Sequence, residues 1–479
     1  MTLKPKKQDL PRAAVKASTR VPSRQTLGWL ALAFLTVGSV GDLGTAPATA
    51  VFGLASVALY VLPAVVFLVP ASLVSAELAS GWPGGVYNWV SEGISPAMGF
   101  IAVWCQFAQT MFYYPAVLAY VASTLAYVIA PDLAHSGVYT TAAIIVLFWA
   151  AVLAAARGAV GVDKLASYGI VIGTLIPGLL LVVLAAIYLL QGHPSAAALD
   201  AHHAVPPWHG LTSVVLVVNG FFTYAGVEVN AVHVDELDDA PRQFPKAILL
   251  AVILILLVFI FPTLAISVVI PSAHISLTAG VMQAFNFLLH HFSLGFLEPG
   301  IGLALMVASL SGVVDWLTGP STGLLHIGRE RGYLPRYFQE VNTNGVQLRI
   351  LVAQGIVVTL IGLLYALTPS VSRAYWILAA LATEVYLIMY ILMFIAARNL
   401  RRRQPGHPRG YRAPALAAIC IVGALASAAA CIVGLLPPAQ LGHANGPLYA
   451  LGLLSGVLAI GVVPPVLLLR LRKPDWKAP

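Results

Sequence analysis

Thr36-Val-Gly-Ser-Val-Gly-Asp-Leu-Gly-Thr-Ala-Pro47 interrupts the first long apolar stretch of the chain with three glycines, an aspartate and a proline. A second interruption lies in the sixth apolar stretch and reads Asn219-Gly-Phe-Phe-Thr-Tyr-Ala-Gly-Val-Glu-Val-Asn230. Gly and Pro weaken helices, and in a bilayer an unwound backbone survives only where it lines a cavity or is buried in protein. The two stretches therefore predict broken helices around a polar site inside a membrane protein.

The composition supports a membrane protein built only from helices. Hydrophobic residues make up 59% of the 479 residues and charged residues only 9%, whereas soluble domains carry about 25% charged residues. A spanning helix needs about 20 apolar residues. Twelve stretches qualify: 27–52, 57–79, 97–130, 139–157, 164–191, 210–233, 247–270, 296–326, 348–368, 372–397, 412–436 and 447–470.

The positions of Lys and Arg predict the orientation of these spans. None occurs between Arg24 and Arg157, or between Lys164 and Arg242. With twelve spans and a cytoplasmic N-terminus, every Lys and Arg except Arg373 falls on the cytoplasmic side, as the positive-inside rule requires. We therefore expect a multi-pass protein of the bacterial inner membrane with both termini in the cytoplasm. Its net charge of +8 needs no nucleic acid as partner, because membrane lipid accounts for it.

The two interruptions occupy matching places in the chain, which predicts its domain organisation. They lie in the first span of each of two five-helix halves, 27–191 and 210–397, a pattern typical of inverted-repeat transporters with a midplane site. Close packing of Gly-rich helices is the alternative explanation. The remaining segments are a basic tail (1–26), two further helices (412–470) and a short tail (471–479).

Five carboxylates lie in or at the ends of the predicted spans. Ionisable groups inside a membrane mark functional sites by default, so we interpret Asp42, Glu228, Asp315 and Glu384 as candidates for proton coupling. Glu77 is instead expected at a solvated helix end or as an acceptor for loop amides. No metal site or cofactor is predicted, and the three cysteines, Cys105, Cys420 and Cys431, are interpreted as packing residues.

The unwound backbone predicts how a substrate is held. Free N–H groups where a half-helix begins suit a carboxylate, and free carbonyls suit an ammonium group, so the site fits a zwitterionic amino acid. Candidate gating aromatics are Phe222, Tyr224 and Trp316, each of which could equally be a packing residue. From the first interruption we select Gly38, Ser39, Gly41, Asp42 and Gly44 as substrate-binding residues.

Several motifs resemble the amino acid–polyamine–organocation superfamily, and within it the bacterial glutamate:GABA antiporters. They are Tyr224-Ala-Gly-Val-Glu228 with His233-Val-Asp-Glu236, Ala76-Glu77-Leu-Ala, Trp89-Val-Ser91, Ser276-Leu-Thr-Ala-Gly-Val-Met-Gln283, Gly319-Pro-Ser321 and Asn342-Thr-Asn-Gly345. The resemblance implies a leucine-transporter-type fold of five plus five helices with two more. It also implies that Tyr224, Gly226 and Glu228 contact substrate.

This chain departs from the antiporter branch in two places. Those proteins carry Tyr-Glu-Tyr before the proline that matches Pro47, where this chain has Gly44-Thr45-Ala46. They also carry a C-terminal plug, which we do not expect here because the sequence stops at Pro479. Asp42 and Asp315 make the expected cavity more acidic, which favours a cationic substrate.

The sequence therefore predicts a secondary transporter and not an enzyme. We expect exchange of an amino acid for an amine by alternating access, in a monomer or homodimer. Sodium should be dispensable, since Lys164 could supply a fixed charge near the place where sodium-coupled relatives hold the ion; the alternative is that Lys164 is an ordinary positive-inside residue. The alternative is a proton-coupled uptake permease for neutral or cationic amino acids or polyamines. The cytoplasmic segments carry no signalling module, which disfavours a sensor.

Overall fold

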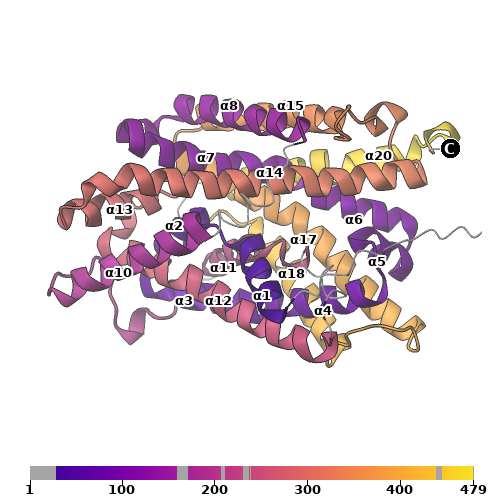
Figure 1. Ribbon diagram of the computed structural model, residues 1–479, viewed down its shortest axis with the longest axis horizontal. Coiled ribbons are helices and arrows are strands. Elements are labelled where there is room, and N and C mark those ends of the chain that lie inside the picture. The colour runs from indigo at the N-terminus through magenta and orange to yellow at the C-terminus, as the bar shows by residue number, and fades with distance from the viewer. Residues whose placement is uncertain are drawn as a thin grey trace, which may run out of the picture.

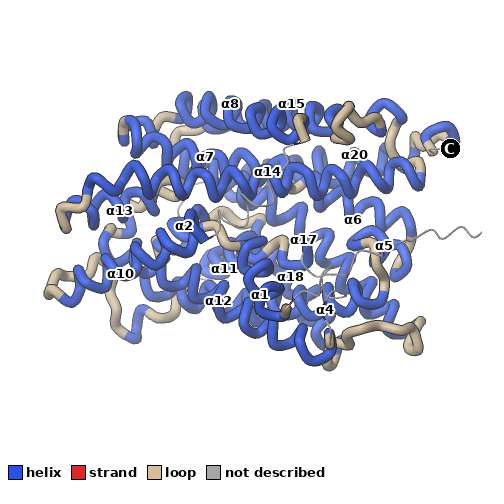
Figure 2. The backbone as a smooth tube through the Cα atoms, in the orientation of Figure 1, coloured by secondary structure: helices blue, strands red, loops and turns tan. Residues whose placement is uncertain are grey.

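The computed structural model describes residues 28–158, 171–206, 211–229, 237, 239–438 and 445–477, and every regular element in them is a helix (Figure 2). The predictions made for the tail 1–26, Lys164 and His233–Glu236 lie outside these residues. The main helices are α1 Trp29–Val40, α2 Ala46–Ala50, α3 Ser56–Pro63, α4 Val69–Gly81, α5 Gly85–Gly93, α6 Pro96–Ala108, α7 Thr110–Ile129, α8 Gly137–Ala156, α10 Ile176–Leu190, α11 Leu211–Tyr224, α12 Ala240–Val269, α13 Gly280–His291, α14 Glu298–Arg331, α15 Leu348–Gly362, α16 Leu364–Leu367, α17 Val371–Arg403, α18 Leu416–Gly434, α19 Gly446–Gly456 and α20 Val463–Arg470.

The predicted helical membrane fold is confirmed. Ten helices in the described part of the chain are long and apolar enough to cross a bilayer, and the bent pair Trp29–Gly38 and Leu43–Ala50 makes an eleventh candidate. The predicted sixth span contains α11, a described helix of 14 residues, which is short of a full crossing. The total of twelve spans and the inverted repeat stay predictions.

The helices form one bundle in which most of them run along the long axis, and α14 extends over its whole length (Figure 1). α1 packs along α12, α7 along α14, and α18 along α17. α17 also contacts α5, α6, α7 and α11. Because α17 contacts elements from early, middle and late parts of the chain, it forms the central column of the bundle.

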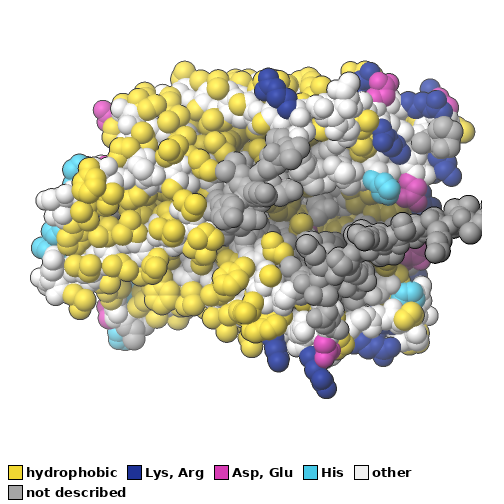
Figure 3. Space-filling model, viewed as in Figure 1, with side chains coloured by type: hydrophobic (Ala, Val, Ile, Leu, Met, Phe, Trp, Pro, Cys, Tyr) yellow, Lys and Arg dark blue, Asp and Glu magenta, His cyan; other side chains and the backbone are white. Residues whose placement is uncertain are grey.

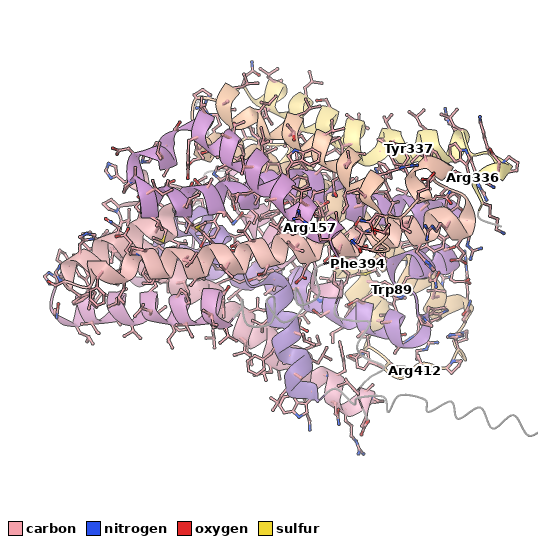
Figure 4. All side chains as sticks on the ribbon, turned by 45° about the horizontal axis from the view of Figure 1, so that its top comes forward. Trp89, Arg157, Arg336, Tyr337, Phe394 and Arg412 are labelled. Atoms are coloured by element: carbon pink, nitrogen blue, oxygen red, sulfur yellow. The ribbon has the colours of Figure 1, made fainter. Side chains whose placement is uncertain are left out.

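Charged side chains separate along this axis in the way a membrane protein requires. Lys and Arg gather at one end of the surface, and apolar side chains cover a broad band beside them (Figure 3). Arg336 and Arg412 lie at that end, whereas Arg157 lies nearer the middle of the bundle (Figure 4). We call the end that carries Arg336 and Arg412 the basic end. The distribution agrees with the charge asymmetry in the sequence, since charges are costly in hydrocarbon.

The C-terminal segment is part of the basic end. Gln339 Nε2 donates to the carbonyl of Trp476 over 2.6 Å, and Arg472 donates to the carbonyl of Arg331, also over 2.6 Å. Arg336 also donates to the carbonyl of Asp475. These bonds hold residues 472–476 against the segment that joins α14 to α15.

Glu77 is the centre of a buried ionic cluster at the basic end. Its Oε1 accepts from Arg401 over 3.1 Å and from Arg409 over 2.8 Å, and its Oε2 accepts from the amide of Ala413 over 2.7 Å. The side chains of Glu77 and Arg409 are 2% and 0% exposed. The predicted contact with a loop amide is confirmed, but the expected solvation of Glu77 is wrong, because the loop 404–413 folds over the end of α4.

The same loop packs against aromatic residues. The Arg409 guanidinium lies 5.2 Å from the centre of the Trp82 ring, and His407 stacks on that ring at 4.6 Å. Burial raises the pKa of the Tyr411 hydroxyl to about 12, and the charge of Glu77 acts in the same direction. Tyr411 therefore stays neutral beside the cluster at physiological pH.

We predict that Glu77→Gln lowers the free energy of unfolding by about 3–5 kcal/mol, because it leaves the buried charge of Arg409 without a counter-ion. Chemical denaturation of the purified protein in detergent measures this loss. Glu92→Gln is the matched control, since Glu92 is exposed on α5. A surface change of that kind should stay within about 0.5 kcal/mol. Equal midpoints for the two variants would show that the cluster does not stabilise the fold.

Candidate functional site

The first helix break lies where the sequence predicts it. α1 ends at Val40, the backbone of Asp42 is extended, and Leu43–Thr45 forms a short 3-10 turn before α2. The axes of the two segments differ by 44°. The Asp42 carboxylate accepts from the amide of Gly44 over 2.8 Å. Asp42 is therefore the N-cap of the second half-helix, which explains why the chain resumes a helical course there.

The second break follows α11. The helix ends at Tyr224, and Gly226 has φ +104°, a left-handed conformation that favours glycine. The Gly226 amide donates to the Tyr390 hydroxyl over 2.8 Å, so α17 satisfies the backbone that the break leaves free. A 3-10 turn at residues 227–229 then carries Glu228 into the protein, where it is 1% exposed.

Glu228 is held by three side chains from two other spans. Its Oε1 accepts from the Tyr386 hydroxyl over 2.5 Å and from the Gln106 amide over 3.1 Å. Its Oε2 accepts from the hydroxyl of Tyr390. Tyr390 thus joins Gly226 and Glu228 through one hydroxyl group. We call these four side chains, Glu228, Gln106, Tyr386 and Tyr390, the Glu228 cluster.

Asp42 has a different environment. Both its carboxylate oxygens lie 3.4 Å from the hydroxyl of Ser309 on α14. Thr174 donates to the carbonyl of Gly41 over 3.2 Å and so satisfies a carbonyl that the break leaves free. The carboxylate already occupies the Gly44 amide. A substrate carboxylate would have to compete with Asp42 for that amide, whereas an ammonium group would find an acceptor.

A row of aromatic rings connects the second break with the Glu228 cluster. The Tyr113 ring lies 6.2 Å from Phe222 and 5.9 Å from Trp316, and Trp316 lies 6.2 Å from Tyr386. Tyr386 lies 5.1 Å from Tyr390. These rings come from α7, α11, α14 and α17. The predicted gating residues Phe222 and Trp316 therefore belong to one aromatic surface, which ends at the two tyrosines that hold Glu228.

The other predicted site residues are Tyr224, Asp315, Glu384, Gly38 and Ser39. The Tyr224 hydroxyl donates to the carbonyl of Tyr60 over 3.0 Å, which fixes α11 on α3. Asp315 precedes Trp316 on an exposed part of α14, and Glu384 is buried on α17 at 5% exposure. Gly38 and Ser39 lie in α1, and the Ser39 side chain is outside the described part. The Oε1 of Glu384 lies against Gly434 of α18.

The residues that bond to Asp42 and Glu228 were not predicted from the sequence. Tyr386 and Tyr390 are four residues apart and thus on one face of α17, a spacing that is readable in the sequence. Their partners cannot be predicted from the sequence, since Gln106 and Glu228 come close to these tyrosines only when the helices pack. The described residues contain no group of three His, Cys, Asp or Glu side chains that could hold a metal ion.

Comparison with known proteins adds independent evidence. Residues 27–460 match the family model described as amino acid permease. The chain is 33% identical over 448 residues to an uncharacterized transporter of Legionella pneumophila, covering 92% of this chain and 96% of that protein. It is 29% identical over 414 residues to a glutamate/gamma-aminobutyrate antiporter of Lactococcus lactis, with 84% and 82% covered. It is also 25% identical over 361 residues to a probable agmatine/putrescine antiporter of that species, with 73% and 74% covered.

We predict that Asp42→Ala lowers the free energy of unfolding by about 1 kcal/mol, because the amide of Gly44 loses its capping acceptor. Asp42→Asn should leave stability nearly unchanged, since asparagine caps helices as well as aspartate does. Denaturation of both purified variants measures the difference. If asparagine is as harmful as alanine, the charge of Asp42 and not its capping bond stabilises the break.

Proposed function

The chain belongs to the amino acid permease family, within the amino acid–polyamine–organocation superfamily and near its glutamate:GABA branch, and on this premise we propose that it exchanges an amino acid for an amine. It is a multi-pass bacterial membrane protein and a transporter, not an enzyme. We further propose that it works by alternating access without sodium, with both termini in the cytoplasm.

The observation that carries the proposal is the pair of helix breaks, each with a carboxylate. Asp42 lies at the first break and Glu228 at the second, and the row of rings from Phe222 to Tyr386 connects the second break with the Glu228 cluster. Breaks of this kind at matching positions support a substrate site between them.

The contacts of Asp42 indicate which end of a substrate this break would hold. Its carboxylate caps the half-helix and faces Ser309, so the site offers a negative charge. A substrate with an ammonium group fits this charge better than one recognised only by a carboxylate. We therefore propose that the first break binds the ammonium group of an amino acid or amine.

Protons are the proposed coupling ion, and Glu228 is the best placed of the candidate groups. It touches the second break directly and is bonded to α6 and α17, so any movement of the broken helix must rearrange its three hydrogen bonds. Asp42, at the first break, and Asp315, beside Trp316 on α14, are other candidates. Glu384 is buried on α17 beside Gly434 of α18.

Counterflow in proteoliposomes tests the function. Vesicles loaded with unlabelled glutamate, gamma-aminobutyrate, arginine, putrescine or leucine are placed in labelled substrate, with and without sodium. We expect an internal amine or amino acid to accelerate uptake, with no effect of sodium. Uptake that needs no internal substrate would favour the alternative, a proton-coupled permease. Steep sodium dependence would contradict the proposed coupling, and no uptake of any of these compounds would contradict the function.

We predict that Glu228→Gln removes the difference between transport at acidic and at neutral external pH, because the substituted side chain cannot gain or lose a proton. The same counterflow assay measures it. Glu340→Gln is the control, since Glu340 pairs with Arg349 in an exposed loop. A variant that folds and keeps the pH dependence of the unsubstituted protein would exclude Glu228 from coupling.

A further inference from the structure

The last predicted span contains a π-helical segment between two α-helices. α19 leads into this segment, η12 Val457–Val462, and α20 follows it. Pro464 and Pro465 lie in the first turn of α20. In an α-helix the residues at these positions would donate to the carbonyls of Ile460 and Gly461, four residues earlier, but proline has no N–H group. The sequence therefore leaves two carbonyls of a membrane span without α-helical donors.

Two side chains of α6 donate to these carbonyls. Trp104 Nε1 donates to the carbonyl of Ile460 over 2.8 Å. Cys105 Sγ donates to the carbonyl of Gly461 over 3.8 Å. α20 also packs against α6 (Figure 1). In a bilayer a freed carbonyl needs a partner within the protein. Two adjacent residues of α6 therefore hold the two carbonyls that the proline pair leaves free.

The next residue of α6 is Gln106, a member of the Glu228 cluster. Successive residues of an α-helix are about 100° apart, so Trp104 and Gln106 project from nearly opposite sides of α6. Trp104 donates to the last span on one side, and Gln106 donates to Glu228 Oε1 over 3.1 Å on the other. α6 therefore lies between the π-helical segment and the Glu228 cluster.

η12 also packs against α17, the other helix of the cluster. A Cβ added at Gly461 would lie 3.1 Å from a methyl group of Val385. Val385 precedes Tyr386, which donates to Glu228 Oε1 over 2.5 Å. The Oε1 atom of Glu228 thus accepts one bond from α6 and one from α17, and η12 contacts both helices beside the residues that make these bonds.

The groups that bond to Glu228 determine how readily it gains a proton. α17 presents two titratable groups, the hydroxyls of Tyr386 and Tyr390. α6 presents the neutral amide of Gln106, and its titratable thiol, Cys105, bonds to the last span instead. Each donor favours the ionised carboxylate over the protonated one. A change in the place of α6 would therefore alter the proton affinity of Glu228 through Gln106.

We propose that Trp104 is a positioning residue for Glu228, and that the π-helical segment of the last span is the support to which it anchors α6. The bond to Ile460 fixes α6 so that Gln106 reaches Glu228 Oε1. The inference rests on the proposed coupling role of Glu228. It gives the last span, which lies outside the two predicted five-helix halves, a part in setting the pH at which Glu228 gains its proton.

Infrared titration of Glu228 tests the inference without a transport assay. The purified full chain in detergent is titrated between about pH 4 and 9, and the protonated-carboxyl band of Glu228 is identified by subtracting the spectrum of Glu228→Gln. Gln106→Ala should move the midpoint of this band upward by about 1–2 pH units, because the ionised carboxylate loses a donor. Trp104→Phe should move it in the same direction by about 0.5 unit, because the ring stays and only the anchoring N–H group is lost.

Trp149→Phe is the matched control. Trp149 Nε1 of α8 donates to Thr359 of α15 over 3.1 Å, so this change also removes one indole bond between two spans. The control should keep the midpoint of the unsubstituted protein. The proposal would be overturned by an unshifted midpoint in Trp104→Phe, by an equal shift in Trp149→Phe, or by a Glu228 band that does not titrate in this range.

Pro464→Ala separates the positioning role from stability. It supplies an N–H group four residues after Ile460, so the carbonyl that Trp104→Phe leaves free regains a donor. We expect the double variant to regain its free energy of unfolding and to keep the shifted midpoint. A midpoint that returns together with the stability would overturn the positioning role and leave Trp104 as a structural residue.

The counterflow assay is run separately, so the inference and the proposed function can fail independently. A shifted Glu228 band in Trp104→Phe, together with a Glu228→Gln variant that keeps its pH-dependent transport, would refute the coupling role and keep the positioning role. An unshifted band, together with a Glu228→Gln variant that loses its pH dependence, would do the reverse.

Discussion

Every backbone group freed by a helix break inside a membrane must find a partner in the protein, and this constraint organises the structure. The Gly226 amide bonds to Tyr390, and the Gly41 carbonyl bonds to Thr174. The Gly44 amide bonds to the Asp42 carboxylate. Without these partners each break would cost several kcal/mol in hydrocarbon. The residues around the candidate site therefore support the backbone and also define the chemistry that a substrate meets.

Single side chains that bond to two groups at once join the broken helices to the rest of the bundle. Tyr390 holds the second break with its hydroxyl and reaches Glu228 with the same group, so one side chain of α17 serves both backbone and carboxylate. Asp42 likewise caps a half-helix and contacts α14 through Ser309. Movement of either break would disturb several bonds together, as a switch between two discrete arrangements requires.

The sequence predicts the breaks and the membrane fold because each depends on local composition. Gly, Asp and Pro in Thr36–Pro47 weaken the helix wherever they occur, and apolar stretches identify spans. The partners of the acidic residues depend on packing between distant segments. Neither the arginines that neutralise Glu77 nor the tyrosines that hold Glu228 follow from spacing alone. The contact of Glu384 with Gly434 was likewise not predictable, because periodicity does not say which neighbour a helix face meets.

The Glu77 cluster also has a consequence for biosynthesis. Glu77 and Arg409 are 332 residues apart. At a synthesis rate of about 5–20 residues per second, α4 waits on the order of tens of seconds before Arg409 leaves the ribosome. During that interval the carboxylate lacks the arginines and the loop amide that hold it in the folded protein. A loop synthesised late in the chain therefore completes the burial of one of the first helices.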